Sequence, residues 1–158
     1  MVQSARRMVP LVLAIVAAGS TGPLQAQAPA FPEFTRHVVD SEFRGGYQGI
    51  ATDVDGDGRL DIVALSTGPL LRWYRNPGWE AYPIETGAER LINAAPHDVD
   101  GDGDLDLALA SSFNLNDSQG GGLVGWAEAP DDPTTTHAWT LHPIDAVPTS
   151  HPVRWADV

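Results

Sequence analysis

The chain has 158 residues, enough for one domain of modest size with its own hydrophobic core. Its 21 acidic residues outnumber its 9 basic ones, and the net charge of -12 argues against nucleic acid or anionic membranes as partners, because both would be repelled. The absence of cysteine excludes a disulfide scaffold, a thiolate metal site and a cysteine nucleophile. Divalent cations, in contrast, are attracted to such a chain.

Residues 1–28 have the pattern of a secretory signal peptide. Arg6 and Arg7 give a positively charged start, residues 9–19 are an apolar run too short to span a bilayer, and the segment "LQAQA" offers a cleavage site. The alternative is a buried N-terminal helix. The signal peptide predicts a mature protein that is secreted, periplasmic or extracellular, with no membrane insertion after cleavage.

Two landmarks recur along the rest of the chain at matched spacings. The first is an acidic, glycine-containing loop with spacings of 45 and 59 residues, and its copies begin at Asp53, Asp98 and Asp157. The second is an aromatic residue followed three places later by His or Tyr, with spacings of 45 and 60 residues, and its copies begin at Phe34, Trp79 and Trp139. Matched spacings of two separate features indicate an internal repeat.

Within each repeat, short apolar runs alternate with turns rich in glycine and proline, which predicts four short antiparallel strands. Four strands in about 45 residues is the size of a β-propeller blade, so the predicted fold class is all-β. The predicted parts are a blade-closing strand at 33–40, blades at 46–86 and 91–145, and the start of a next blade at 150–158. Because propellers typically have about 4 to 8 blades, this chain is predicted to be the N-terminal part of an incomplete propeller.

The acidic loops have the composition of a site for a hard cation. In the loop from Asp53 to Asp61, side-chain oxygens at positions 1, 3, 5 and 9 and a backbone carbonyl at position 7 can surround an ion of calcium's size. Glycine at position 6 permits the sharp turn. Oxygen ligands favour Ca2+ over zinc or copper, and Mg2+ would demand a tighter octahedron. The predicted metal-binding residues are Asp53, Asp55, Asp57, Arg59, Asp61, Asp98, Asp100, Asp102, Asp104 and Asp106, with Arg59 and Asp104 contributing carbonyl oxygens.

Two other structures could explain the acidic loops, an EF-hand and a hairpin turn that binds no ion. An EF-hand would need glutamate at position 12, where the chain has Ala64 and Leu109, and flanking helices, where strands are predicted. An acidic hairpin turn that binds nothing is the remaining alternative, since Asp-Gly pairs are common in hairpins. Carboxylates about 5 Å apart repel by roughly 3 kcal/mol per pair at an effective dielectric constant near 20, which favours a counter-ion.

The segments "DVDGDGRLDIVA" and "DVDGDGDLDLALA", preceded by predicted strands, resemble the FG-GAP and VCBS repeats of integrin-α-type β-propellers, which are widespread in secreted bacterial proteins. The Phe-Gly and Gly-Ala-Pro words behind the first name are absent, so the resemblance is closer to the VCBS type. It implies calcium loops with a structural role. It also implies partners among carbohydrates or proteins of the matrix and cell surface.

The predicted function is a secreted calcium-binding module that binds a carbohydrate or an extracellular protein without chemistry. No catalytic constellation is visible in the sequence, so neither a catalytic residue nor a cofactor other than Ca2+ is predicted. Two alternatives stay open: the N-terminal part of a polysaccharide lyase or sugar dehydratase type of propeller enzyme whose catalytic residues lie in other blades, and a scaffold or adhesin. An insertion at 112–122, opposite the acidic loops, is either a contact surface or tolerated loop drift.

Overall fold

The computed structural model describes residues 31–114, 116–117, 119–148 and 150–156. The chain divides into two units, Met1–Arg36 and His37–Val158, and the described residues of the first unit contain no helix or strand. The predicted signal peptide and Asp157 lie outside the described residues. In the part of the chain that is described, no helix is long and apolar enough to cross a membrane.

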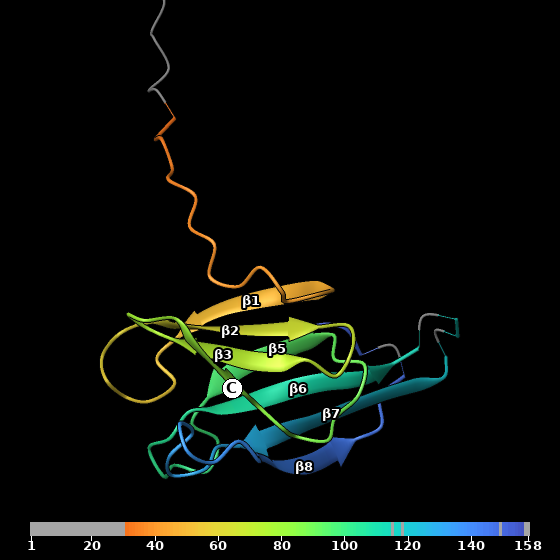
Figure 1. The fold of residues 1–158 in the computed structure, drawn as a ribbon. Coiled ribbons are helices and arrows are strands. Elements are labelled where there is room, and N and C mark those ends of the chain that lie inside the picture. Colours follow the sequence, from red (N-terminus) through yellow and green to blue (C-terminus); the bar gives the residue numbers. More distant parts are fainter. Residues whose placement is uncertain (1–30, 115, 118, 149, 157–158) are drawn as a thin grey trace, which may run out of the picture. The chain divides into compact units, whose positions relative to one another are not determined.

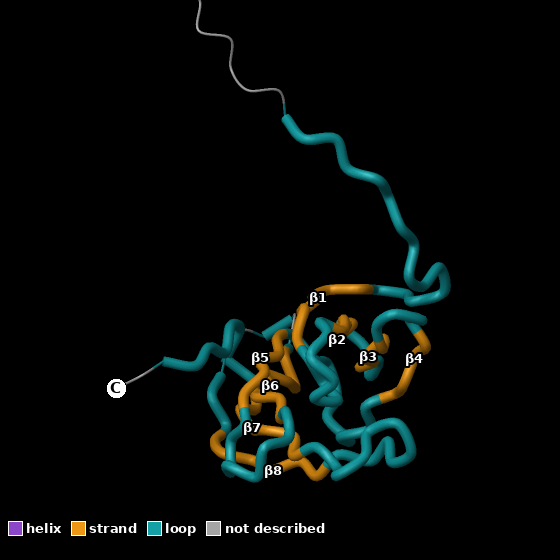
Figure 2. Tube along the Cα trace, turned by 90° about the vertical axis from the view of Figure 1, so that its left-hand side faces the viewer, coloured by secondary structure: helices purple, strands orange, loops and turns teal. Residues whose placement is uncertain are grey.

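The second unit contains two four-stranded antiparallel sheets, and each strand pairs with the next one in the sequence (Figure 1). The first sheet consists of β1 (Gly46–Thr52), β2 (Asp61–Ser66), β3 (Leu71–Arg75) and β4 (Glu80–Pro83). The second consists of β5 (Asn93–His97), β6 (Asp106–Phe113), β7 (Gly121–Glu128) and β8 (Thr140–Asp145). Figure 2 shows the described residues as strands and loops alone. The predicted all-β class with four strands per repeat is confirmed, and the pair of sheets is consistent with part of a propeller.

One hydrophobic core joins the two sheets. On the first sheet, Val63 pairs with Trp73 and Leu65 pairs with Leu71, so these four side chains share one face. Burying that face removes large apolar surfaces from water, which is the main favourable contribution to the stability of the pair of sheets. The core continues on the second sheet and in the residues that flank its strands, through Leu91, Ala94, Leu107, Leu109, Ala127, Ala129 and Trp139.

Backbone groups also connect the sheets. The side-chain amide of Gln48 on β1 donates to the Ala94 carbonyl at 3.1 Å and accepts from the Ala94 N–H at 2.8 Å. At the other edge, the N–H of Glu85 donates to the His137 carbonyl at 2.8 Å, and the N–H of Trp139 donates to the Glu85 carbonyl at 3.0 Å. These bonds fix the register between the two repeats as well as their packing.

Residues 150–156 form no strand in the structure but lie beside β5. Asn93 Oδ1 accepts the Val153 N–H at 2.8 Å. Gln48 and Asn93 each stand five residues before the first aspartate of an acidic loop. Ala94 stands four residues before Asp98, and Val153 stands four residues before Asp157, where a third loop is predicted to begin. The same amide-to-backbone contact therefore recurs one repeat later, in the register predicted for the start of a next blade.

The strand predicted at 33–40 is absent from the structure, where these residues form a loop. A strand exists only through ladder hydrogen bonds to a neighbour, and in the described part of the chain residues 33–40 make none. Asp40 instead accepts a hydrogen bond from the Tyr74 hydroxyl at 2.7 Å. Ring closure by this segment stays a prediction.

The insertion predicted at 112–122 lengthens a hairpin. β6 and β7 have 8 residues each, whereas the equivalent β2 and β3 have 6 and 5. Part of the predicted loop is therefore strand, because β6 runs to Phe113 and β7 begins at Gly121. In Figure 1 this hairpin reaches past the β2–β3 turn.

Candidate metal centre

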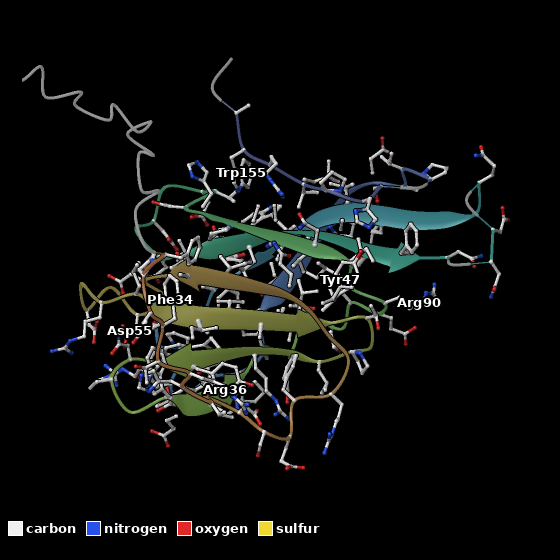
Figure 3. All side chains as sticks on the ribbon, turned by 90° about the horizontal axis from the view of Figure 1, so that it is seen from above. Phe34, Arg36, Tyr47, Asp55, Arg90 and Trp155 are labelled. Atoms are coloured by element: carbon white, nitrogen blue, oxygen red, sulfur yellow. The ribbon has the colours of Figure 1, made fainter. Side chains whose placement is uncertain are left out.

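The two acidic loops connect equivalent strands and lie at the same end of their sheets (Figure 1). The first joins β1 to β2 and is closed by the pairing of Thr52 with Asp61, and the second joins β5 to β6 and is closed by the pairing of His97 with Asp106. Figure 3 shows Asp55 of the first loop at one end of the sheets and Arg90 at the other. An antiparallel strand pair therefore holds both ends of each loop at a fixed spacing.

Each loop brings three of its predicted ligands together. One carboxylate oxygen from each member lies within 4.8 Å of those of the other two in the group Asp53, Asp55 and Asp61, and likewise in the group Asp98, Asp100 and Asp106. These are positions 1, 3 and 9 of the predicted pattern. Such a cluster of oxygens can hold a hard metal ion.

Position 5 of the pattern does not join these groups. Asp57 Oδ1 accepts the Arg59 N–H at 2.9 Å, and Asp102 Oδ1 accepts the Asp104 N–H at 2.8 Å. Both carboxylates thus stabilise a turn two residues ahead, a common use of aspartate in loops. The carbonyl ligands predicted at Arg59 and Asp104 stay predictions.

Position 9 is a buried support for the loop as well as a member of the oxygen cluster. Asp61 is 1% exposed; its Oδ2 accepts the Val54 N–H at 3.1 Å and its Oδ1 accepts the Asn76 N–H at 2.7 Å. Burial raises its pKa, while the two N–H donors oppose that shift. One carboxylate thereby ties the start of the loop to the residue that follows β3.

Asp106 repeats this arrangement in the second loop. Its Oδ2 accepts the Val99 N–H and its Oδ1 accepts the Ala129 N–H, both at 2.9 Å, and burial raises its pKa. Each carboxylate oxygen has two lone pairs, so one of each remains available for a cation. The sequence pattern predicted these aspartates as ligands but did not predict their bonds to the backbone.

Position 1 folds the loop back on itself. Asp53 accepts the N–H groups of Asp57 at 3.1 Å and Gly58 at 2.8 Å, and Asp98 accepts that of Gly103 at 3.2 Å. Gly58 and Gly103 have φ angles of 86° and 101°, and a Cβ at either position would meet nothing within 4 Å. The predicted need for glycine at position 6 is confirmed, and its cause is the backbone conformation and not lack of space.

Position 3 of the first loop carries an oxygen without a hydrogen bond. The Asp55 side chain is 8% exposed, and its buried Oδ2 accepts no hydrogen bond. Arg75 Nε lies 2.5 Å from this oxygen, but its N–H is not directed at it, so the contact is an ion pair alone. The charge of this buried oxygen is balanced by Arg75, but its lone pairs accept no hydrogen bond and are open to a bound cation.

Arg75 was not predicted as a site residue. It stands at the end of β3, two places after Trp73, and the equivalent position in the second repeat is Glu128. The sequence held one signal, an arginine and a glutamate at matched positions beside matched acidic loops, but the contact with Asp55 depends on how β2 and β3 pair.

The two loops also lie next to each other. A hollow of about 250 Å³ is lined by residues of both, among them Asp53, Asp55, Asp98 and Asp104. Burial and neighbouring carboxylates, Asp102 first among them, raise the pKa of Asp104. This end of the sheets therefore concentrates negative charge from two repeats.

Residues 53–109 match the family model described as FG-GAP-like repeat. This segment is an FG-GAP-type repeat. The matched residues begin at the first acidic loop, include the whole second loop and end on β6. The matched segment therefore covers parts of both four-stranded units and contains both oxygen clusters. The resemblance to FG-GAP repeats predicted from the two loops is confirmed, and the closer likeness to the VCBS type stays a prediction. No curated protein and no solved structure matches the chain in two further comparisons.

Proposed function

We propose that the chain is a secreted calcium-binding repeat module, in which each acidic loop holds one structural calcium ion and the sheets present a surface to a carbohydrate or an extracellular protein. The observation that carries the proposal is the pair of matched aspartate clusters in an FG-GAP-type repeat, one of which contains a buried oxygen without a hydrogen bond.

The chemistry of the donors supports calcium among the possible cations. All side-chain donors in both clusters are carboxylate oxygens, and the described residues offer no histidine within either cluster, so zinc and copper are disfavoured. Calcium accepts irregular shells of 6 to 8 oxygens, whereas magnesium requires a tighter octahedron. The triads would supply three of these ligands, with Asp57, Asp102, backbone carbonyls and water as candidates for the others.

The proposed partner surface lies at the end of the two sheets opposite the acidic loops. The β6–β7 hairpin is longer there than β2–β3, and extra length on one repeat is typical of a contact region. Secretion rests on residues 1–28, which the structure does not describe. A net charge of -12 supports partners that are not themselves strongly acidic.

Replacing Asp100 by Asn tests calcium binding in the second loop, where the substitution disturbs the calcium-free structure least. Asn keeps the Oδ1 that accepts the Asp102 N–H at 3.1 Å and removes one charge from an exposed side chain. Calcium at ten times its dissociation constant stabilises a site by about 1.4 kcal/mol, so we expect the variant to lose about 3–5 °C in melting temperature in calcium. In chelator its melting temperature should equal or slightly exceed that of the wild type, because like-charge repulsion decreases.

Asp145→Asn is the matched control. It makes the same charge change on exposed β8, where Asp145 Oδ1 accepts the N–H of the next residue. Its melting temperature should respond to calcium as the wild type does. Equal losses of Asp100→Asn in calcium and in chelator would contradict a bound ion, and a larger stabilisation by magnesium than by calcium would contradict its assignment.

A further inference from the structure

The two acidic loops have the same backbone contacts but opposite charges beside them. Tyr74 pairs with Ile62 and Ala127 pairs with Leu107, so the residues that follow them, Arg75 and Glu128, are equivalent. At position 7 of the loops, the first repeat has Arg59 where the second has Asp104. At both positions a cation in the first repeat is therefore replaced by an anion in the second.

Arg59 and Arg75 are both paired with carboxylates of the first loop. Arg75 Nε lies 2.5 Å from Asp55 Oδ2, and its Nη2 lies 3.9 Å from Asp57 Oδ2. Arg59 Nη1 lies 3.2 Å from the same oxygen of Asp57. Four carboxylates and two guanidinium groups leave the first loop with a local charge of -2.

The second loop has no such pairing. In the described part of the chain, no arginine or histidine forms an ion pair with any of its five carboxylates, so its local charge is -5. Glu128 is directed elsewhere, with its Oε2 2.6 Å from His142 Nε2. Asp100, the equivalent of the covered Asp55, is exposed.

We propose that Arg75 is a tethered counter-ion that competes with calcium for Asp55, so that the second loop binds calcium more tightly and fills first. This inference rests on the calcium binding proposed above. A guanidinium group and a divalent cation repel each other, so calcium can use Asp55 Oδ2 fully only when Arg75 moves away. Arg75 is 42% exposed, and its long side chain can turn into water without unfolding β3.

The competing explanation is that Arg75 is an ordinary surface ion pair. Such a pair contributes little, and its loss would change the stability of the calcium-free and calcium-bound protein equally. Competition makes a different prediction: removing Arg75 destabilises the calcium-free first loop, where it neutralises a carboxylate, and strengthens calcium binding there. The sign of the change in calcium affinity therefore separates the two explanations.

Calorimetric titration of the full chain with CaCl2 tests the proposal when a substitution in one loop leaves the other loop to dominate the binding signal. Asp100→Asn weakens the second loop and reports the first, and Asp55→Asn does the reverse. We expect the second loop to bind calcium at least about tenfold more tightly than the first, since charge count tunes such sites over several orders of magnitude. Adding Arg75→Gln to the Asp100→Asn chain should then tighten binding to the first loop by about five- to tenfold.

Arg72→Gln is the matched control, because Arg72 lies on the same strand and pairs with Asp40 at 3.3 Å, away from the loops. At about 0.15 M salt the Debye length is about 8 Å, so this change should alter calcium affinity less than twofold. Thermal melts give the second readout: Arg75→Gln should lower the melting temperature in chelator and enlarge the increase that calcium produces.

The outcomes are distinguishable. If both loops bind calcium and Arg75→Gln leaves the affinity of the first loop unchanged, or if the first loop is the tighter one, the inference is wrong and the proposed function stands. If neither loop of the wild-type chain binds calcium, the proposed function is wrong and the inference falls with it.

Discussion

Trp73 on β3 and Trp126 on β7 occupy equivalent positions in the two sheets. Trp73 pairs with Tyr82 on the next strand, and Trp126 pairs with His142; the ring centroids are 4.8 Å and 4.3 Å apart, and both pairs are stacked. Trp73 is 0% exposed in the core between the sheets, whereas Trp126 is half-buried. The repeat therefore fixes backbone position and cross-strand pairing, while the element that packs against each sheet determines burial.

Truncating the two tryptophans should give the largest difference between the repeats. Trp73→Ala removes a fully buried ring and should lower the free energy of unfolding by about 3–5 kcal/mol. Trp126→Ala should cost about 1–2 kcal/mol, because less apolar surface returns to water. Urea denaturation in excess calcium measures both. Equal losses would show that the far face of the second sheet is as fully covered as the core.

The amide contacts between successive repeats provide a second comparison. Gln48→Ala leaves both backbone groups of Ala94 without their partner, and leaving such groups unsatisfied should cost about 1–3 kcal/mol. Asn93→Ala releases one backbone group, the N–H of Val153, and the Arg154 guanidinium, which also donates to Asn93 Oδ1 at 3.2 Å; because Arg154 can turn to water, the cost should be about 1 kcal/mol.

These two variants are also measured by urea denaturation, with hydrogen exchange at the released amides as a second readout. Exchange should accelerate at Ala94 in the Gln48 variant and at Val153 in the Asn93 variant. If the Asn93 variant destabilises more than the Gln48 variant, the segment after β8 is held more firmly than the first sheet is held to the second.

The sequence predicted the features of this fold whose causes are local. The spacing of the aspartates and the glycine at position 6 determine how each loop turns, and all of these residues lie within nine consecutive positions. Alternation of apolar residues with turn signals similarly determined four strands per repeat. Both features were predicted correctly because they depend on neighbours in the sequence.

Contacts between distant residues were not predictable in the same way. Arg75 reaches Asp55 only because β2 and β3 pair in one register, and Asp61 binds the N–H of Asn76 for the same reason. The segment at 33–40 has an apolar pattern suited to a strand, but a strand also needs a pairing edge, and none of the described strands pairs with it. A pattern in one segment cannot specify which partner that segment meets.

Tyr74 and Ala127 are a further equivalent pair. Each follows the tryptophan of its strand and so lies on the opposite face of its sheet, and the two residues show that this face is covered differently in the two sheets. Ala127 is buried in the core between the sheets, whereas Tyr74 donates its hydroxyl to Asp40 Oδ2 at 2.7 Å. This hydrogen bond is the main cause that lowers the pKa of Asp40. Burial, followed by the same hydrogen bond, raises the pKa of Tyr74 to about 12. A polar contact thus holds residue 40 against the first sheet.

The Tyr74→Phe variant should lose this contact at a cost of about 0.5–1 kcal/mol near neutral pH, the smallest effect of the three comparisons. Because the folded pKa of Tyr74 lies above its usual value of 10.0, the contribution of its hydroxyl is complete below pH 10 and decreases as pH rises towards about 12. Because the folded pKa of Asp40 lies below 3.8, its contribution is present above that pH and is lost as pH falls through the folded pKa. Urea denaturation of both proteins across the pH range should therefore show their difference shrinking at both extremes, and other titrating groups cancel in the comparison. A difference that stays constant with pH would mean that Tyr74 acts through packing alone, as Ala127 does.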